Sequence, residues 1–217
     1  MNKNLKAVFF GSIGTVAETS EIQRRSYNLA FNRLNIDCYW NVANYCEMLK
    51  VPGGKDRLRN FTIPNISEED VDKVHNLKEE IYAELIERED ISRIEFVEVF
   101  HHSKASDLKV GLITTTSEKN INSLSKALED KVNFSDFDII TTSKDCTNPK
   151  PSPEIYENAL RKIGVSPNEA IAIEDTQVNL DASLSANINS ILYPGEYSNY
   201  TTEVKPSFNL MEKIFQI

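Results

Sequence analysis

The feature that most constrains the fold is the regular alternation of short apolar runs with amphipathic helical patterns from Lys109 onward. Runs such as KVGLI at Lys109–Ile113 and AIAI at Ala170–Ile173 are almost wholly apolar, which is typical of strands buried on both faces. Alternating strands and helices predict a parallel sheet covered by helices. The expected strands are Leu5–Phe10, Lys109–Ile113, Phe137–Thr141, Ala170–Ile173 and Ser190–Tyr193, and the helices that accompany them are Ser117–Leu128, Pro153–Ile163, Val178–Ala186 and Asn209–Phe215.

A block with helical periodicity and almost no strand signal separates the first strand from the others. Its first helix begins at Ser20, and Ser20 and Gln23 have the spacing of a capping box. Further helices are expected at Trp40–Leu49, Lys55–Phe61, Glu68–Asp90 with Ser67 as N-cap, and Ile94–Ala105. We therefore expect an α/β core domain formed by residues 1–15 and 91–217, into which residues 16–90 are inserted as an all-helical domain.

Charge and composition exclude several classes of function. The formal net charge of the 217 residues is −9 at pH 7, whereas nucleic acids and anionic membranes attract basic surfaces. No apolar run is long enough to span a bilayer. The three cysteines are scattered and are expected to be reduced thiols in the cytoplasm, or in the plastid stroma if a transit peptide was removed. The expected partner is a small anion, and a protein partner remains open.

Residues with useful chemistry follow the predicted strands. Gly11–Thr15 (GSIGT) follows the first strand, Thr114–Ser117 (TTTS) the second and Glu174 with Asp175 the fourth, while Lys150 precedes a helix. Open parallel sheets bind ligands at the carboxyl ends of their strands, so these residues are expected to converge. A threonine hydroxyl, the amides at a helix start and a lysine suit a phosphate group, and two adjacent acids suit Mg²⁺.

This order of motifs resembles the haloacid dehalogenase (HAD) superfamily and, more narrowly, its CbbY-type and β-phosphoglucomutase-like phosphatases. The segments that carry the resemblance are Ala17–Phe31 (AETSEIQRRSYNLAF), Val51–Arg57 (VPGGKDR), Ile113–Ser117 (ITTTS), Lys150–Tyr156 (KPSPEIY), Ala172–Thr176 (AIEDT) and Tyr193–Ser198 (YPGEYS). The resemblance covers nearly the whole chain. It implies a Rossmann-like core with a helical cap, Mg²⁺ as cofactor and a phosphorylated sugar, such as xylulose-1,5-bisphosphate, as substrate.

The resemblance also implies covalent catalysis, in which two aspartates after the first strand do the chemistry. The first attacks phosphorus, the second exchanges protons with the leaving alcohol and with water, and Mg²⁺ neutralises charge between carboxylate and phosphate. In this chain the two positions are Gly11 and Ile13, which have neither a nucleophilic atom nor an exchangeable proton. A glutamate and a histidine typical of the family at the start of the cap are also replaced, by Ser20 and Gln23. We therefore expect hydrolysis to be lost or strongly impaired.

Other positions match the family's pattern, and the resemblance assigns them roles. The phosphate-binding residues are expected to be Thr114, Thr115 and Lys150, and the substrate-binding residues of the cap Glu18, Arg24, Lys55 and Arg57. Weak Mg²⁺ binding is expected through Asp175, Glu174 and the backbone carbonyl of Ile13, since one of the two carboxylate sources is missing.

Three functions remain open on the sequence alone. The chain can be a binder of sugar phosphates without turnover, a phosphatase that uses an atypical mechanism through Ser12 or Glu18, or a structural or partner-binding protein on the HAD scaffold. The motif offers Ser12 no adjacent general base, which disfavours the atypical phosphatase.

Overall fold

The centre of the protein is a parallel five-stranded sheet with the strand order β3-β2-β1-β4-β5. The computed structural model describes residues 4–49, 53–198, 206–207 and 209–216, so Val51 and Pro52 of the motif VPGGKDR lie outside the described residues. The strands are β1 (Ala7–Phe10), β2 (Lys109–Leu112), β3 (Ile139–Ile140), β4 (Ala170–Glu174) and β5 (Asn189–Leu192). Each predicted strand is confirmed. β3 is shorter than expected because Phe137 closes a 3-10 turn, donating its N–H to the carbonyl of Phe134 at 3.3 Å.

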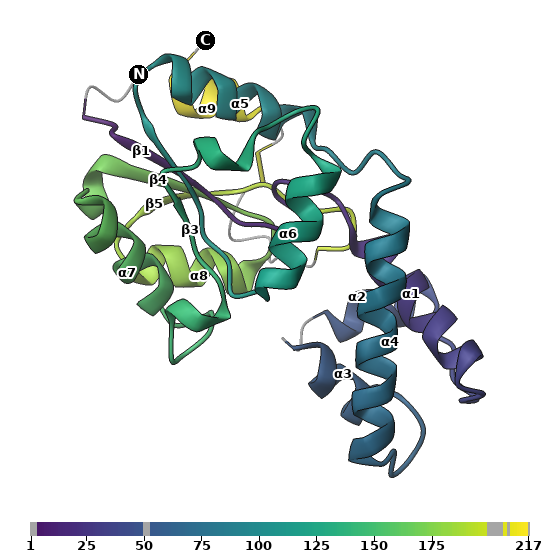
Figure 1. Cartoon of the computed structure of the whole chain (residues 1–217). Coiled ribbons are helices and arrows are strands. Elements are labelled where there is room, and N and C mark those ends of the chain that lie inside the picture. The colour runs from purple at the N-terminus through teal and green to yellow at the C-terminus, as the bar shows by residue number, and fades with distance from the viewer. Residues whose placement is uncertain (1–3, 50–52, 199–205, 208, 217) are drawn as a thin grey trace.

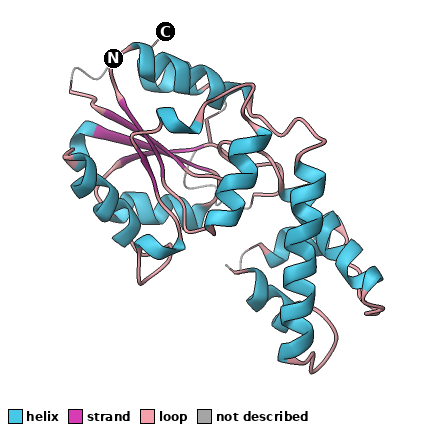
Figure 2. Ribbon diagram, in the orientation of Figure 1, coloured by secondary structure: helices cyan, strands magenta, loops and turns pink. Residues whose placement is uncertain are grey.

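Helices cover both faces of the sheet, as the sequence predicts (Figures 1 and 2). One face carries α5 (Ile94–Ala105), α6 (Glu118–Ala127) and α9 (Leu210–Phe215), and the other carries α7 (Glu154–Ile163) and α8 (Gln177–Ser185). The alternation of side chains along β1 divides its residues between two cores. Val8 and Phe10 pack against the α5 side, and Ala7 and Phe9 against the α7 side.

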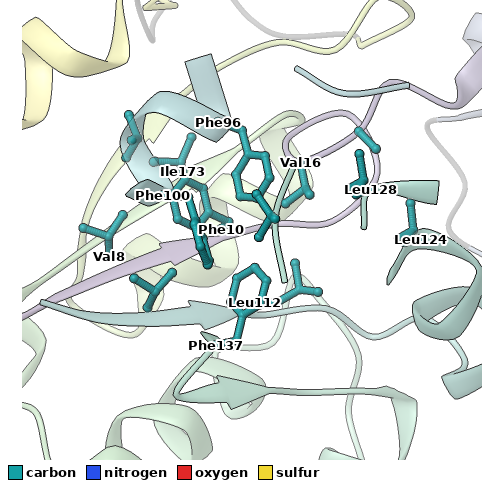
Figure 3. Packing of buried hydrophobic residues seen from close by; sticks show 14 of the residues in the cluster. Val8, Phe10, Val16, Phe96, Phe100, Leu112, Leu124, Leu128, Phe137 and Ile173 are labelled. Carbon is teal, nitrogen blue, oxygen red and sulfur yellow. The ribbon is translucent and has the colours of Figure 1, made fainter. Parts of the chain in front are cut away.

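Aromatic rings make up much of the core on the α5 side (Figure 3). Phe10 and Phe96 meet edge to face, with ring centroids 5.0 Å apart and planes at 87°. Phe100 lies 5.0 Å from Phe137 and 5.8 Å from Phe96, measured between centroids. Such contacts add about 0.5–1.5 kcal/mol per pair beyond the burial of apolar area. They fix α5 on β1, the strand that leads to the candidate site.

The segment between β1 and α5 forms a separate group of helices beside the sheet (Figure 1). Its helices are α1 (Ser20–Arg33), α2 (Val42–Met48), α3 (Gly54–Phe61) and α4 (Glu68–Ile86). They enclose their own buried cluster, which includes Tyr27, Phe31, Trp40 and Tyr45. Ser67 caps α4 as predicted, accepting the N–H of Asp70 at 3.0 Å. No helix within the described residues is both long and apolar enough to cross a membrane.

The predicted capping box of Ser20 and Gln23 is wrong. The helix starts at Ser20 itself, Thr19 precedes it, and no side-chain hydrogen bond caps the helix. The N–H of Ser20 instead donates to Glu18 Oε1 at 2.9 Å. A carboxylate two residues upstream has therefore taken the backbone group that a capping side chain would bind.

Two antiparallel chain segments connect the helical group to the sheet. Glu18 donates its N–H to the carbonyl of Ile91 at 2.9 Å, and Arg93 donates its N–H to that of Val16 at 3.3 Å. The guanidinium of Arg93 also donates to the carbonyls of Gly14 and Pro194. The loop after β1 is thus held on both sides, which fixes the positions of the residues in the site.

We predict that Phe96→Ala lowers the free energy of unfolding by about 3–5 kcal/mol, because it leaves a cavity against Phe10 in the aromatic core. The matched control is Ile94→Ala on the same helix, since Ile94 is 67% exposed and its change should have little effect. Urea unfolding followed by circular dichroism measures both. Equal losses in the two variants would contradict this account of the core.

Candidate functional site

A cavity of about 830 Å³ lies between the carboxyl ends of the strands and the helical group. The sheet side contributes Ser12, Ile13, Thr114, Thr115, Lys150 and Asp175, and the helical side contributes Ser20, Gln23, Tyr27, Arg57, His75 and Lys78. The sequence prediction that the loops after β1, β2 and β4 converge is therefore confirmed.

The threonine directly beyond Ile113, at the end of β2, is fixed in place by its neighbours. The N–H of Thr114 donates to Thr141 Oγ1 at 2.9 Å, and the Thr141 hydroxyl donates back to the Thr114 carbonyl at 2.9 Å. The Thr114 hydroxyl accepts the N–H of Thr116 at 3.1 Å and lies 2.9 Å from Ser12 Oγ. Just beyond, Ser117 caps α6. Two hydroxyls and the first residues of α6 thus lie at one end of the cavity, where the helix dipole favours an anion.

The lysine before α7 supplies a buried positive charge at the same end. Lys150 is 7% exposed, and its ammonium donates to the carbonyl of Ile113 at 2.9 Å and to Glu174 Oε1. The Tyr156 hydroxyl donates to the same carboxylate oxygen. Burial, together with the charge of Glu174, raises the pKa of Tyr156, so this hydroxyl keeps its proton. An ammonium has three N–H donors, so one remains for a ligand in the cavity.

Two glycines bring the loop after β1 against the acidic pair. A Cβ on Gly11 would lie 2.2 Å from Glu174 Oε2, and a Cβ on Gly14, where φ is +81°, would lie 2.3 Å from Asp175 Oδ2. The carboxylate of Glu174 therefore fills the space that a side chain at position 11 would need. Ile13 faces the cavity, where it presents only an aliphatic side chain.

The donor set offered to Mg²⁺ is small. Asp175 Oδ1 accepts from Asn179 Nδ2 at 3.0 Å, and Glu174 Oε1 is occupied by Lys150 and Tyr156, so Glu174 Oε2 is the carboxylate oxygen of this residue that has no hydrogen-bond partner among the described residues. Burial and the neighbouring charge of Glu174 raise the pKa of Asp175 to about 7, which lowers its charge near neutrality. No group of three His, Cys, Asp or Glu side chains within the described residues could hold a metal. These residues do not fit the oxygen-rich octahedron that Mg²⁺ requires.

The four cap residues assigned by resemblance are not brought together. Arg57 lines the cavity, whereas Glu18, Arg24 and Lys55 do not. Glu18 accepts the N–H of Glu196 at 2.6 Å, and Lys55 is paired with Asp72 at 2.7 Å on the surface. Arg24 donates to Glu21 at 2.6 Å and to the carbonyl of Trp40 at 2.8 Å. The charges of these three residues are thus engaged within the scaffold.

The structure adds a buried cation that the sequence reasoning missed. Lys78 of α4 lines the cavity at 3% exposure and donates to Glu79 Oε1 at 2.8 Å. Its ammonium lies 5.3 Å from the centroid of the Tyr27 ring, and burial lowers its pKa. The signal was present in the sequence. Lys78 interrupts the buried stripe of α4 that includes Val71, Val74, Ile81 and Tyr82, where a lysine is rarely placed without a partner.

Comparison with known proteins agrees with this geometry. The family model of the haloacid dehalogenase-like hydrolases matches residues 14–193. Protein CbbY of Rhodobacter capsulatus is 31% identical over 198 residues, which are 89% of this chain and 87% of CbbY. A CbbY mutant from Rhodobacter sphaeroides, solved with xylulose-1,5-bisphosphate, superposes with a TM-score of 0.85 at 29% identity, covering 95% of this chain and 96% of that one. β-Phosphoglucomutase from Clostridium difficile, at 24% identity and a TM-score of 0.70 over 96% of both chains, shares the fold. The chain therefore belongs to the haloacid dehalogenase-like hydrolases, among the relatives of the CbbY-type sugar-phosphate phosphatases.

Proposed function

We propose that this protein binds a phosphorylated sugar in the cavity and hydrolyses it very slowly or not at all. The observation that carries the proposal is the end of β1, where Gly11 has no side chain and Ile13 presents an aliphatic one. Removing a covalent nucleophile costs on the order of 10⁶ in rate, and losing general acid–base catalysis costs about 10²–10⁴. Positioning of the substrate alone leaves little turnover after both losses.

The binding half of the proposal rests on donors at both ends of the cavity. The sheet end has Thr114, Ser12 and the Lys150 ammonium. The opposite end has Arg57 and Lys78, together with Glu80 and with Glu79, which is the ion-pair partner of Lys78. Cationic groups at two ends suit a sugar with two phosphates, and the CbbY mutant of similar structure was solved with such a ligand. We assign the phosphate group to Thr114, Thr115 and Lys150.

Three further parts of the proposal concern the domain boundaries, the metal ion and the location of the protein. We propose residues 1–15 and 91–217 as the core and residues 16–90 as the cap, because α1–α4 surround a buried cluster of their own. Haloacid dehalogenase-like enzymes generally use Mg²⁺, and we propose that Mg²⁺ binding is weak or absent here, because Asp175 is the acid that lines the cavity on the sheet side. A cytoplasmic location is supported by the three cysteines, all of which are free thiols.

The contacts of Ser12 speak against an atypical phosphatase. Its hydroxyl lies against the Thr114 hydroxyl at 2.9 Å, and no carboxylate or imidazole within the described residues makes a hydrogen bond with it. A serine nucleophile needs a base that takes its proton, and Thr114 cannot act as one.

The first prediction concerns turnover. The wild-type protein should hydrolyse xylulose-1,5-bisphosphate far more slowly than CbbY, and Gly11→Asp with Ile13→Asp should raise the rate by at least about 10²-fold by returning the nucleophile and the acid–base group. Phosphate release in the presence of Mg²⁺ measures both. The control pairs Gly11→Asn with Ile13→Asp, which has the same shape but no carboxylate at position 11. Wild-type turnover equal to that of CbbY would refute the proposal.

The second prediction concerns binding. Thr114→Val keeps the shape of the side chain and removes its hydroxyl, so the dissociation constant for inorganic phosphate should rise about tenfold. Thr142→Val is the matched control, because Thr142 also lies beyond the end of a strand and is similarly buried, at 9% exposure against 5%, but does not line the cavity. Isothermal titration calorimetry measures both constants. Equal affinity of the two variants would show that phosphate does not bind at Thr114.

A further inference from the structure

Glu174 is the least exposed charged group of the site and faces Gly11. The residue is 0% exposed, and its two carboxylate oxygens have different surroundings. Oε1 accepts from both Lys150 and Tyr156, whereas Oε2 is buried and has no hydrogen-bond partner among the described residues. Oε2 lies 2.2 Å from the point that a Cβ at position 11 would occupy. The unpaired oxygen is therefore directed into the space that glycine leaves open.

The glycine and the position of this carboxylate depend on one another. Any larger residue at position 11 would place its Cβ far inside contact distance of Oε2, so the carboxylate would have to turn away. The ammonium of Lys150 and the hydroxyl of Tyr156 oppose such a turn, because both hold Oε1. Removing one partner from a buried ion pair leaves an uncompensated charge, which is strongly unfavourable. The side chains of Glu174, Lys150 and Tyr156 thus form one hydrogen-bonded cluster beneath the cavity.

The charges in this cluster of Glu174, Lys150 and Tyr156 determine whether the cavity favours a cation or an anion. Glu174 and Lys150 neutralise each other, and Glu174 does not line the cavity. The acid that faces the cavity on this side is Asp175, whose oxygens lie within 3.0 Å of Asn179 Nδ2 and 3.4 Å of Ser198 Oγ. Apart from Glu174 Oε2, which is directed into the space beside Gly11, this side of the cavity offers one such carboxylate and a backbone carbonyl, and these are a poor site for a small, strongly hydrated divalent ion. An anion, in contrast, meets the remaining donor of Lys150 and two hydroxyls.

We propose that Glu174, turned into the space beside Gly11 and held there by Lys150, prevents assembly of a divalent-cation site, so that this pocket takes its phosphate ligand on the Lys150 ammonium independently of Mg²⁺. The part that concerns the phosphate ligand rests on the proposed function. The part that concerns the cation does not, because it rests on the contacts of Glu174, Gly11 and Asp175 alone.

The first experiment adds Mg²⁺ alone to the purified full chain and monitors thermal unfolding and calorimetric heat. The wild-type protein should show neither a shift nor binding heat. Gly11→Asp should gain both, because a carboxylate there would join Asp175 and the Ile13 carbonyl as oxygen ligands. Gly11→Asn is the matched control, since it displaces Glu174 equally but adds no charge. A thermal shift of the wild-type protein with Mg²⁺ would overturn the inference, whether or not the variants fold.

The second experiment titrates inorganic phosphate in EDTA and in excess MgCl₂. The wild-type dissociation constant should differ by less than about twofold between the two, whereas Gly11→Asp should bind at least about tenfold more tightly with Mg²⁺. Glu174→Gln adds a test by sign. If Glu174 neutralises Lys150, the Glu174→Gln variant should bind phosphate more tightly than wild type, by the same factor in both buffers. A loss of phosphate affinity seen only with Mg²⁺ would instead identify Glu174 as a metal ligand and overturn the inference.

The two proposals fail in different ways. If phosphate binds in neither EDTA nor MgCl₂, the proposed function is refuted. The Mg²⁺ titration then still decides whether the wild-type protein binds a divalent cation. If phosphate binds to the wild-type protein only with Mg²⁺, the proposed function stands and the inference about Glu174 is refuted.

Discussion

The pairing of β1 on both of its edges determines where the loops of the site lie. Residues Ala7–Phe10 align in parallel with Lys109–Leu112 on one side and with Ala170–Ile173 on the other. Because the three strands are parallel and in register, their carboxyl ends lie together, and so do the loops that begin at Gly11, Ile113 and Asp175. The connection from β1 to β2 leaves the sheet and returns to it, and the helical group α1–α4 is part of this connection (Figure 1).

A buried ion pair stands where these loops meet. Lys150 and Glu174 have side chains that are 7% and 0% exposed, so both charges depend mainly on partners within the protein. The carbonyl of Ile113 and the hydroxyl of Tyr156 complete their hydrogen bonds. Such a pair contributes little net stability compared with apolar packing, but losing one member is costly. Its main consequence is a fixed arrangement of β2, β4 and α7 beneath the cavity.

The sequence predicts the fold far better than it predicts the site. Apolar runs and helical periodicity placed each strand and helix, because these patterns report directly which faces are buried. The order of motifs also placed Thr114, Lys150 and Asp175 at one cavity, since parallel topology brings strand ends together. Element boundaries were less certain, as β3 shows: a 3-10 turn at Phe134–Asp136 ends at Phe137, and the strand begins only at Ile139.

The sequence could not predict which hydrogen-bond and ion-pair partners the individual side chains have. Arg24 and Lys55 match the family's motifs, yet each is held by an acid of the helical group, and that pairing depends on how α1, α3 and α4 pack. Similarly, the interpretation of Ser20 and Gln23 as a capping box failed because Glu18 takes the N–H of Ser20. Lys78 was overlooked because a lysine in a helical pattern is normally read as surface. The turn of Glu174 toward Gly11 depends on two distant strands and has no local signature.

The residues of this site that match the family's motifs differ in their contacts from those that do not. The Thr114 hydroxyl accepts the N–H of Thr116 and is hydrogen-bonded to the Ser12 hydroxyl, and the Lys150 ammonium is paired with Glu174, so both side chains have partners in the scaffold as well as facing the cavity. Replacing either would leave buried polar groups without partners, at a cost to folding of about 1–3 kcal/mol or more. The side chains at positions 11 and 13 make no such hydrogen bonds. Gly11 has no side chain, and Ile13 adds an aliphatic surface to the cavity wall. Residues without catalytic chemistry can therefore stand at positions 11 and 13 without weakening the scaffold, whereas replacing Thr114 or Lys150 would weaken it.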